Sequence, residues 1–198
     1  MSTGEPMAFE RAFQLAGEVH ARLAPVCARL KAAGSLRRRR PLVRDLEFVC
    51  EPNTVTDLLG ESAYDVESIR QVCQRMGDIE KSGNKYIKVV NLLGVDGLCL
   101  DLWLVTPPAQ WGSILAIRTG PAELGKLAVS RMADFDLYHR DGRVVDSAGR
   151  LYPTPEEEDF FRAARLPYLK PHERDSREAM TPLRLQKPGK CCGGHACE

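Results

Sequence analysis

Residues 42–50 read Leu42-Val43-Arg44-Asp45-Leu46-Glu47-Phe48-Val49-Cys50, in which polar and apolar side chains alternate at the centre. Alternation with a period of two predicts a β-strand that has one buried face. In that strand Leu46 and Phe48 point towards a core, whereas Asp45 and Glu47 project together from the opposite face. The two acids are either solvent-facing residues paired with nearby arginines or part of a group that binds a ligand.

A second predicted strand, residues 98–105, carries one acid among apolar residues. Its core face holds four leucines, and Asp101 lies in mid-strand on the other face. Aspartate is a poor strand former, so a carboxylate in this place needs a partner. Carboxylates that converge from adjacent strands suit Mg²⁺, a hard cation that takes oxygen ligands. Two such ions can stabilise the attacking and the leaving oxygen of a phosphoryl displacement.

A glycine-serine turn with a basic end precedes the first strand and reads Gly34-Ser35-Leu36-Arg37-Arg38. Gly34 lets the backbone approach a ligand closely, and Ser35 can donate its hydroxyl and backbone N–H to a phosphate. Arg38 adds a charge-assisted contact. Residues 29–44 contain seven basic residues and no acid, which indicates either a phosphate-rich partner or a solvated charged turn. The spacing favours a triphosphate cradle beside the acidic pair.

The remaining pattern predicts an α+β fold in two parts. Residues 9–33 read as a helix with Phe9, Phe13, Ala16 and His20 on one face and a break or kink at Pro25. Further helices are predicted at 64–76 and 121–133, and a further strand at 86–90. Asp141-Gly142 predicts a hairpin between 137–140 and 143–146, and Thr154 is the expected N-cap of a last helix. The first part is therefore a mixed sheet with helices on one side, and the second part is a small α+β lobe.

Several of these motifs, taken in order, resemble the DNA polymerase beta-like (family X) nucleotidyltransferases. The glycine-serine turn followed by the acid-x-acid strand resembles the signature of that superfamily, and Asp101 in Leu100-Asp101-Leu102 resembles its third carboxylate. Arg118-Thr119-Gly120-Pro121 resembles the turn that packs against the incoming sugar. Residues 154–161 and 166–174 resemble the end of the thumb. The likeness runs in register from about residue 9 to residue 174.

The resemblance implies a nucleotidyltransferase palm at residues 7–120, a thumb-like lobe at 121–175 and a flexible tail at 176–198. Asp45, Glu47 and Asp101 would be the catalytic residues and would hold two Mg²⁺ ions, with Mn²⁺ as a substitute. The residues expected to bind a nucleoside triphosphate are Gly34, Ser35 and Arg38 at the phosphates, Thr119 and Gly120 at the sugar, and Lys126 near the template base. The implied activity is DNA-directed DNA polymerase: addition of nucleotides to a primer 3′-hydroxyl on primer/template or gapped DNA, as in short-gap filling during DNA repair.

Three departures from the family pattern keep a second function open. Glu47 stands where polymerases carry aspartate, Arg118 replaces an aromatic residue, and Gly125 replaces a polar reader of the base pair. The alternative is a nucleotidyltransferase that works without a template, or on RNA or a small molecule. A non-catalytic module that only holds nucleic acid is a third hypothesis, against which the complete set of three acids argues.

Length, composition and cysteine use indicate where in the cell the protein works. The chain has 198 residues and a net charge of +1, and no stretch approaches the ~18 apolar residues of a membrane span. No signal peptide is seen, and single cysteines in apolar stretches indicate a reducing compartment. We therefore expect a cytoplasmic monomer without a membrane partner, beside the nucleoid in a bacterium or phage, that works with repair-complex proteins. Cys191, Cys192, His195 and Cys197 near the end of the chain read either as zinc ligands or as a loose tail.

Overall fold

A mixed five-stranded sheet forms the centre of the first lobe. The computed structural model describes residues 5–56 and 59–175. The strand order is β2 (Cys27–Ala32), β4 (Leu46–Pro52), β9 (Leu100–Leu104), β8 (Tyr86–Val90) and β7 (Asp78–Ser82). The pair β4–β9 is parallel, and the other three neighbouring pairs are antiparallel. The sheet is therefore mixed, and its one parallel pair joins the two strands that carry the predicted acids.

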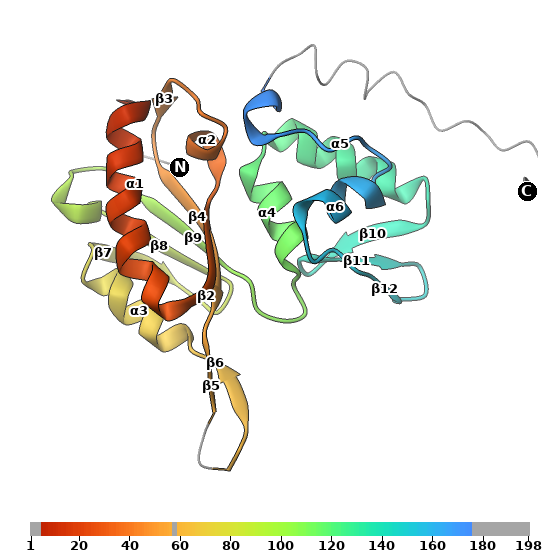
Figure 1. Ribbon diagram of the computed structural model, residues 1–198, viewed down its shortest axis with the longest axis horizontal. Helices are drawn as coiled ribbons and strands as arrows, with labels where there is room; N and C mark the ends of the chain where they lie inside the picture. The colour runs from red at the N-terminus through yellow and green to blue at the C-terminus, as the bar shows by residue number, and fades with distance from the viewer. Residues whose placement is uncertain (1–4, 57–58, 176–198) are drawn as a thin grey trace, which may run out of the picture.

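Two helices cover one face of this sheet. Helices α1 (Phe9–Leu23) and α3 (Val66–Gln74) lie together on that face in Figure 1, and they share one apolar core with β4, β8 and β9. The buried stripe of α1 is Ala12, Leu15, Ala16, Val19 and Leu23. This stripe is rotated from the predicted one, since Phe13 is 63% exposed. The mixed sheet is confirmed, and of the predicted apolar face of α1 only Ala16 lies in the buried stripe, whereas Phe13 and His20 are exposed.

The predicted helix over residues 9–33 is wrong beyond Leu23. A 3₁₀ turn at Ala24–Val26 contains Pro25, and the chain then enters strand β2. Proline removes a backbone donor and clashes with the preceding turn, so the helix stops there as expected. The following residues form a strand because β4 offers them a partner, with Leu30 opposite Cys50 and Ala32 opposite Phe48. Pairing with β4 thus outweighs the local sequence pattern from which a helix was predicted for these residues.

The predicted strand over residues 42–50 is divided in the structure. Residues of β3 (Leu42–Val43) pair with β1 (Met7–Ala8), and β4 begins only at Leu46. Asp45 lies in the bend between the two strands. Helix α2 (Gly34–Arg37) is a single turn between β2 and β3, and β5 (Thr54–Thr56) with β6 (Ser62–Tyr64) forms a separate two-stranded ribbon.

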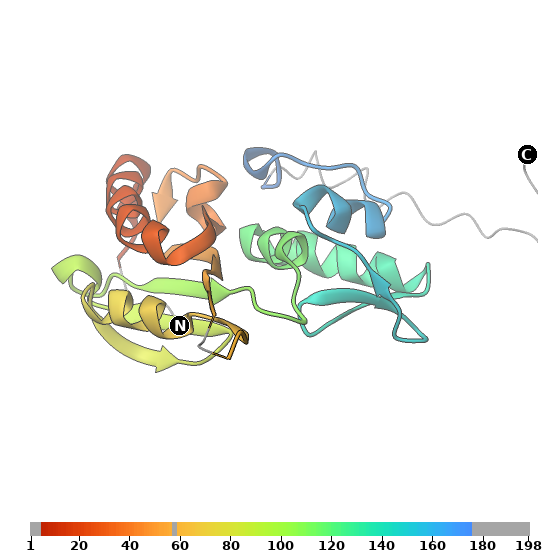
Figure 2. The same ribbon diagram turned by 60° about the horizontal axis from the view of Figure 1, so that its bottom comes forward.

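The second lobe follows β9 and has three layers. Figure 2 shows α4 (Trp111–Thr119) and α5 (Ala122–Ala133) between α6 (Glu157–Ala163) on one side and the small sheet of β10 (Leu137–Arg140), β11 (Arg143–Asp146) and β12 (Leu151–Tyr152) on the other. The predicted hairpin is confirmed, with Asp141 at φ 49° and Gly142 at φ 78° in the turn. Positive φ at both central residues is the requirement of a tight two-residue hairpin. A 3₁₀ turn at Pro171–Glu173 ends the described chain's regular structure.

The last helix begins two residues later than predicted. Its N-cap is Glu156, which forms a capping box with Asp159, rather than Thr154. The Thr154 hydroxyl instead bonds to Ser113 and to the Gln110 side chain in the interior of the lobe. The predicted helix at 121–133 is confirmed as α5, which begins at Ala122, one residue later than predicted. Pro121 is its N-cap.

The architecture confirms an α+β fold, with a mixed five-stranded sheet, smaller antiparallel sheets and six α-helices in the described residues. Helix α4 contacts both lobes, because Trp111 and Leu115 pack with Ala33, Val49 and Val105 while the other side of α4 packs on α6. The two lobes therefore share an apolar joint beside the glycine-serine turn.

Among residues 5–56 and 59–175, no helix combines the length and apolar character required to cross a bilayer. Four free cysteines lie in this part of the chain: Cys50, Cys73 and Cys99 are buried, whereas Cys27 is half-buried. The predicted zinc-type group at Cys191, Cys192, His195 and Cys197 lies outside the described residues.

Candidate active site

Two of the predicted catalytic acids are register partners on adjacent parallel strands. Glu47 in β4 lies opposite Asp101 in β9. The flanking residues Leu46, Phe48, Leu100 and Leu102 are buried in the core on the other face of the sheet. Register partners on adjacent strands are about 5 Å apart, so the pairing brings the two carboxylate-bearing residues side by side. Asp45 precedes β4 by one residue, and its charge acts on Glu47.

The electrostatics of Glu47 report this proximity. Burial raises its pKa to about 7, and the charges of Asp45 and Asp101 add to the rise. The cations of Arg38 and Arg118 act in the opposite direction. A partly buried carboxylate repelled by two others is stabilised by any cation that binds among them. The three predicted acids thus form one electrostatic group.

Gly34 and Glu47 are packed in direct contact. Gly34 has φ +57°, and a Cβ atom at this position would lie 1.8 Å from Glu47 Oε2. No other residue can replace glycine here without displacing the carboxylate. The turn thus approaches the Glu47 side chain closely, whereas the predicted approach of Gly34 to a ligand stays a prediction.

Asp101 is held by an aromatic stack. The Tyr86 hydroxyl donates a hydrogen bond to Asp101 Oδ1. The Tyr86 ring lies 4.4 Å from that of Trp103, and the Arg118 guanidinium carbon lies 3.3 Å from the centroid of the Trp103 ring. Burial and the Asp101 carboxylate raise the pKa of Tyr86, so this hydroxyl remains a donor at neutral pH. Sequence reasoning did not single out Tyr86, because only the pairing of β8 with β9 brings its hydroxyl to Asp101.

The predicted phosphate ligand Arg38 already binds a carboxylate. Its Nε donates to Asp175 Oδ2 at 3.0 Å, and Nη1 donates to the Thr119 carbonyl. Arg40 Nε also lies 3.8 Å from the same Asp175 oxygen. Ser35 is half-buried in the first turn of α2. Arg38 is therefore placed to receive an anion, and an anionic group of the chain itself occupies that contact.

Thr119 and Gly120 lie beside this arginine. Thr119 is buried, and its hydroxyl accepts a hydrogen bond from Arg37. Gly120 has φ +67°, and a Cβ there would lie 3.0 Å from Arg38 Nη1. Lys126 is exposed on α5, where it shares a groove of about 520 Å³ with Arg118. The structure thus brings Thr119 and Gly120 to Arg38, and Lys126 to Arg118.

Arg37 and Glu157 form a buried ionic joint between the two lobes that the sequence did not reveal, in addition to the apolar joint of α4. Arg37 donates two hydrogen bonds of 2.8 Å to the Glu157 carboxylate, and Arg174 donates another of 2.8 Å. Burial opposes ionisation of Glu157, but the Arg37 hydrogen bonds and the Arg174 charge outweigh it and lower its pKa. This joint fixes the second lobe, with Thr119, against the glycine-serine turn.

The donor set fits a magnesium ion in kind, because all three acids supply carboxylate oxygens. In residues 5–56 and 59–175, no group of three or more His, Cys, Asp or Glu side chains is arranged to hold a metal ion. Glu47 is turned towards Gly34 and Asp101 towards Tyr86. A shared ion would therefore require rotation of at least one of these side chains, without any change in strand register.

The pH dependence of stability tests the assignment of Glu47. Because its folded pKa of about 7 exceeds the usual value of 4.5, the folded state holds this proton more tightly than the unfolded state. The resulting stability is present below the unfolded pKa and is lost as pH rises through 7. We expect Glu47→Gln to raise the free energy of unfolding by about 2 kcal/mol at pH 8 and to change it little at pH 4. Denaturant titrations in a metal chelator measure this, and equal effects at both pH values would contradict it.

The chain matches no family model and no curated protein.

Proposed function

We propose that this protein is a nucleotidyltransferase of the family X DNA polymerase type, which adds a nucleotide to the 3′-hydroxyl of a DNA primer. The observation that carries the proposal is the pairing of Glu47 with Asp101 on parallel strands, next to the turn that bears Arg38. Carboxylates and a phosphate-binding arginine in one place are the parts that phosphoryl transfer needs.

Asp45, Glu47 and Asp101 would hold the magnesium ions, which would supply charge neutralisation of the triphosphate and activation of the primer hydroxyl. The raised pKa of Glu47 supports this role, since a cation among the three carboxylates offsets their mutual repulsion. The Gly34 backbone limits the positions open to the Glu47 side chain, because the two are in contact. Binding of a shared ion would therefore include a rotation of the Glu47 or the Asp101 side chain away from its present contact.

The side chains around the acids would orient the reactants. Arg38 binds the leaving β- and γ-phosphates, and Ser35 donates to them from the same turn. The primer 3′-oxygen attacks the α-phosphorus, the bond from phosphorus to the bridging oxygen breaks, and pyrophosphate leaves. Asp101 would accept the proton of the attacking hydroxyl at a carboxylate oxygen, as its resemblance to the third carboxylate of the family implies. Tyr86 fixes the orientation of that carboxylate before the reaction.

The second lobe would hold the nucleotide and the duplex. The groove shared by Arg118 and Lys126 opens on α5, and Arg118 interacts electrostatically with Glu47 and Asp101. Its apolar lining includes Ile117, Ala122 and Val129. A base with its phosphates suits an apolar groove that carries two cations. This arrangement supports substrate binding between the acids and α5.

Primer extension with and without a template strand tests the proposal and separates it from its alternative. A DNA polymerase extends a primer opposite a gap with the complementary nucleotide in the presence of Mg²⁺ or Mn²⁺. Equal extension without a template would favour the template-independent transferase. The absence of any transfer to DNA, RNA or nucleotide acceptors would refute the proposed function.

Triphosphate affinity should increase when the carboxylate that occupies Arg38 is removed. Asp175→Asn abolishes the competing charge, so we expect the Kd of a non-cleavable nucleoside triphosphate to fall about three- to tenfold. Calorimetric titration of the variant and the wild type measures the change. Glu158→Gln is the matched control, because it removes an exposed acid from the same lobe. Equal affinities for Asp175→Asn and the wild type would show that Asp175 does not compete.

A further inference from the structure

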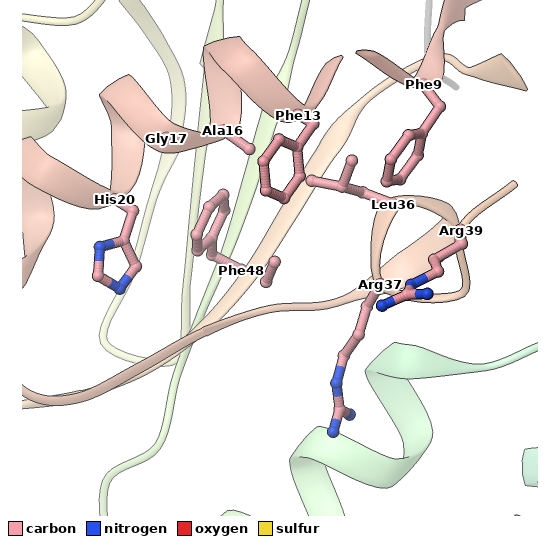
Figure 3. A pocket seen from close by; sticks show the side chains of 10 residues that line it. Phe9, Phe13, Ala16, Gly17, His20, Leu36, Arg37, Arg39 and Phe48 are labelled. Carbon is pink, nitrogen blue, oxygen red and sulfur yellow. The ribbon is translucent and has the colours of Figure 1, made fainter. Parts of the chain in front are cut away.

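An apolar groove lies between α1 and α2, on the face of the first lobe that carries helices. It has a volume of about 340 Å³, and its main lining residues are Phe9, Phe13, His20, Leu36, Arg39 and Phe48. We call it the α1–α2 groove. Figure 3 shows the Phe9 and Phe13 rings with Leu36 between them, and the Arg37 guanidinium directed away from the groove towards the second lobe.

One aromatic residue of the groove, Phe13, is largely exposed to solvent, whereas Phe9 is half-buried and Phe48 is buried. Phe13 is 63% exposed, and its ring is stacked on that of Phe9 with centroids 5.8 Å apart and planes at 27°. A large aromatic side chain exposed beside an apolar groove marks a binding surface more often than an isolated exposed residue does. The face of the Phe13 ring is therefore a platform for a flat partner.

The α2 side of the groove is basic. Arg39 lines the groove and is exposed, and Arg40 follows it in the chain. None of the residues that line the groove is acidic. The apolar floor of the groove suits a flat ring, and its cationic edge suits a negative charge. A ligand that has both would therefore be complementary to the groove.

The backbone of Arg39 supports a functional reading of this edge. Its φ is +58°, in the left-handed region, at the residue that follows the C-cap of α2. Glycine is the usual residue there, because a side chain is strained in this conformation. Strained residues of this kind cluster at ligand-binding sites. An arginine held at this position places its charge beside the groove.

We propose that the α1–α2 groove binds an unpaired base of a single-stranded nucleic acid, with Phe13 as the stacking platform and Arg39 at the adjoining phosphate. Single-strand binding combines aromatic platforms with cations that follow the backbone, which is the combination found here. The site lies on the opposite face of the sheet from Glu47 and Asp101, and it requires no catalysis. It therefore goes beyond the proposed transferase and stands independently of it.

Binding of a labelled thymidine homopolymer, measured by fluorescence anisotropy without metal or triphosphate, tests the proposal. We expect Phe13→Leu to weaken binding about tenfold and Phe13→Tyr to preserve it, since stacking needs a ring. An abasic strand of the same length has no base to stack on Phe13. It should therefore bind the wild type and Phe13→Leu with equal affinity, as weak as that of the homopolymer for Phe13→Leu. Phe13 is mostly exposed, so these variants keep the fold, which thermal melting verifies.

Arginine variants separate the groove from general charge. Arg39→Ala should weaken binding and reduce its salt dependence more than Arg22→Ala, which removes an exposed arginine from α1 outside the groove. Equal binding by wild type and Phe13→Leu, or equal binding of normal and abasic strands, would overturn the proposal. A concentration-dependent dimer that Phe13→Glu abolishes, with no effect of Phe13→Leu on the homopolymer, would show instead that a second copy of the chain covers the groove. Primer extension can succeed or fail independently of each result.

Discussion

Asp101→Asn should abolish nucleotidyl transfer and leave the protein folded. Asparagine has the same shape, keeps an oxygen that can accept the Tyr86 hydrogen bond, and leaves Leu100 and Leu102 in the core. What it loses is the negative charge and the ability to take the primer proton. A general base and metal-binding charge together contribute at least about a thousandfold to rate, so kcat should fall by that factor or more.

Two measurements make the Asp101 prediction specific. Mn²⁺ binding, followed by electron paramagnetic resonance of the free ion without nucleotide, should weaken in Asp101→Asn. Asp96→Asn is the matched control, because Asp96 is an exposed acid in the turn that leads to β9. It should leave both activity and ion binding unchanged. Activity of Asp101→Asn within about threefold of the wild type would show that this carboxylate is not part of a catalytic site.

The side of the sheet on which Glu47 and Asp101 lie could be predicted because it depends on local periodicity. Alternation separates Glu47 and Asp101 from the buried core residues beside them, but the predicted place of Asp45 in the same strand is wrong, because the chain bends there. The parallel pairing of β4 with β9, which brings Glu47 and Asp101 together, depends on distant parts of the chain. The β10–β11 hairpin could be predicted, because its turn residues select their own backbone conformation. Features that lie within one short segment were therefore accessible from the sequence.

Features that depend on distant partners were not accessible. Strand β2 reads as helix until β4 is beside it, and α4 shows no polar face because it is buried between β4 and α6. The orientation of Arg37 depends on Glu157, which is 120 residues away in the chain. Nothing in the local sequence distinguishes Arg37, which pairs with Glu157, from Arg38, which is a candidate phosphate ligand.

Glu157→Gln should be the most destabilising change of a single polar group in the described chain. Glu157 is 3% exposed, and its partner Arg174 is fully buried. Glutamine keeps the volume but removes the charge, which leaves two guanidinium groups in the joint without a counter-ion. Breaking a buried pair in this way costs about 3–5 kcal/mol, whereas an exposed pair such as Arg29 with Glu156 contributes less than about 1 kcal/mol.

Denaturant unfolding of Glu157→Gln against Glu158→Gln, its exposed neighbour, measures the difference. The lowered pKa of Glu157 means that the wild-type joint contributes stability above the usual glutamate pKa and loses it as pH falls through the depressed folded value. The free energies of unfolding of the two variants should therefore differ most at neutral pH and converge in acid.

If Glu157→Gln proves too unstable to purify, Arg37→Lys provides a second test. Lysine keeps the charge but removes the two-pronged contact, so the variant should lose about half as much stability. The joint also fixes Thr119 beside Arg38, so in Arg37→Lys the KM for triphosphate should rise more than kcat falls. Stability equal to that of Glu158→Gln would mean that the lobes are held by the apolar contacts of Trp111 and Leu115 alone.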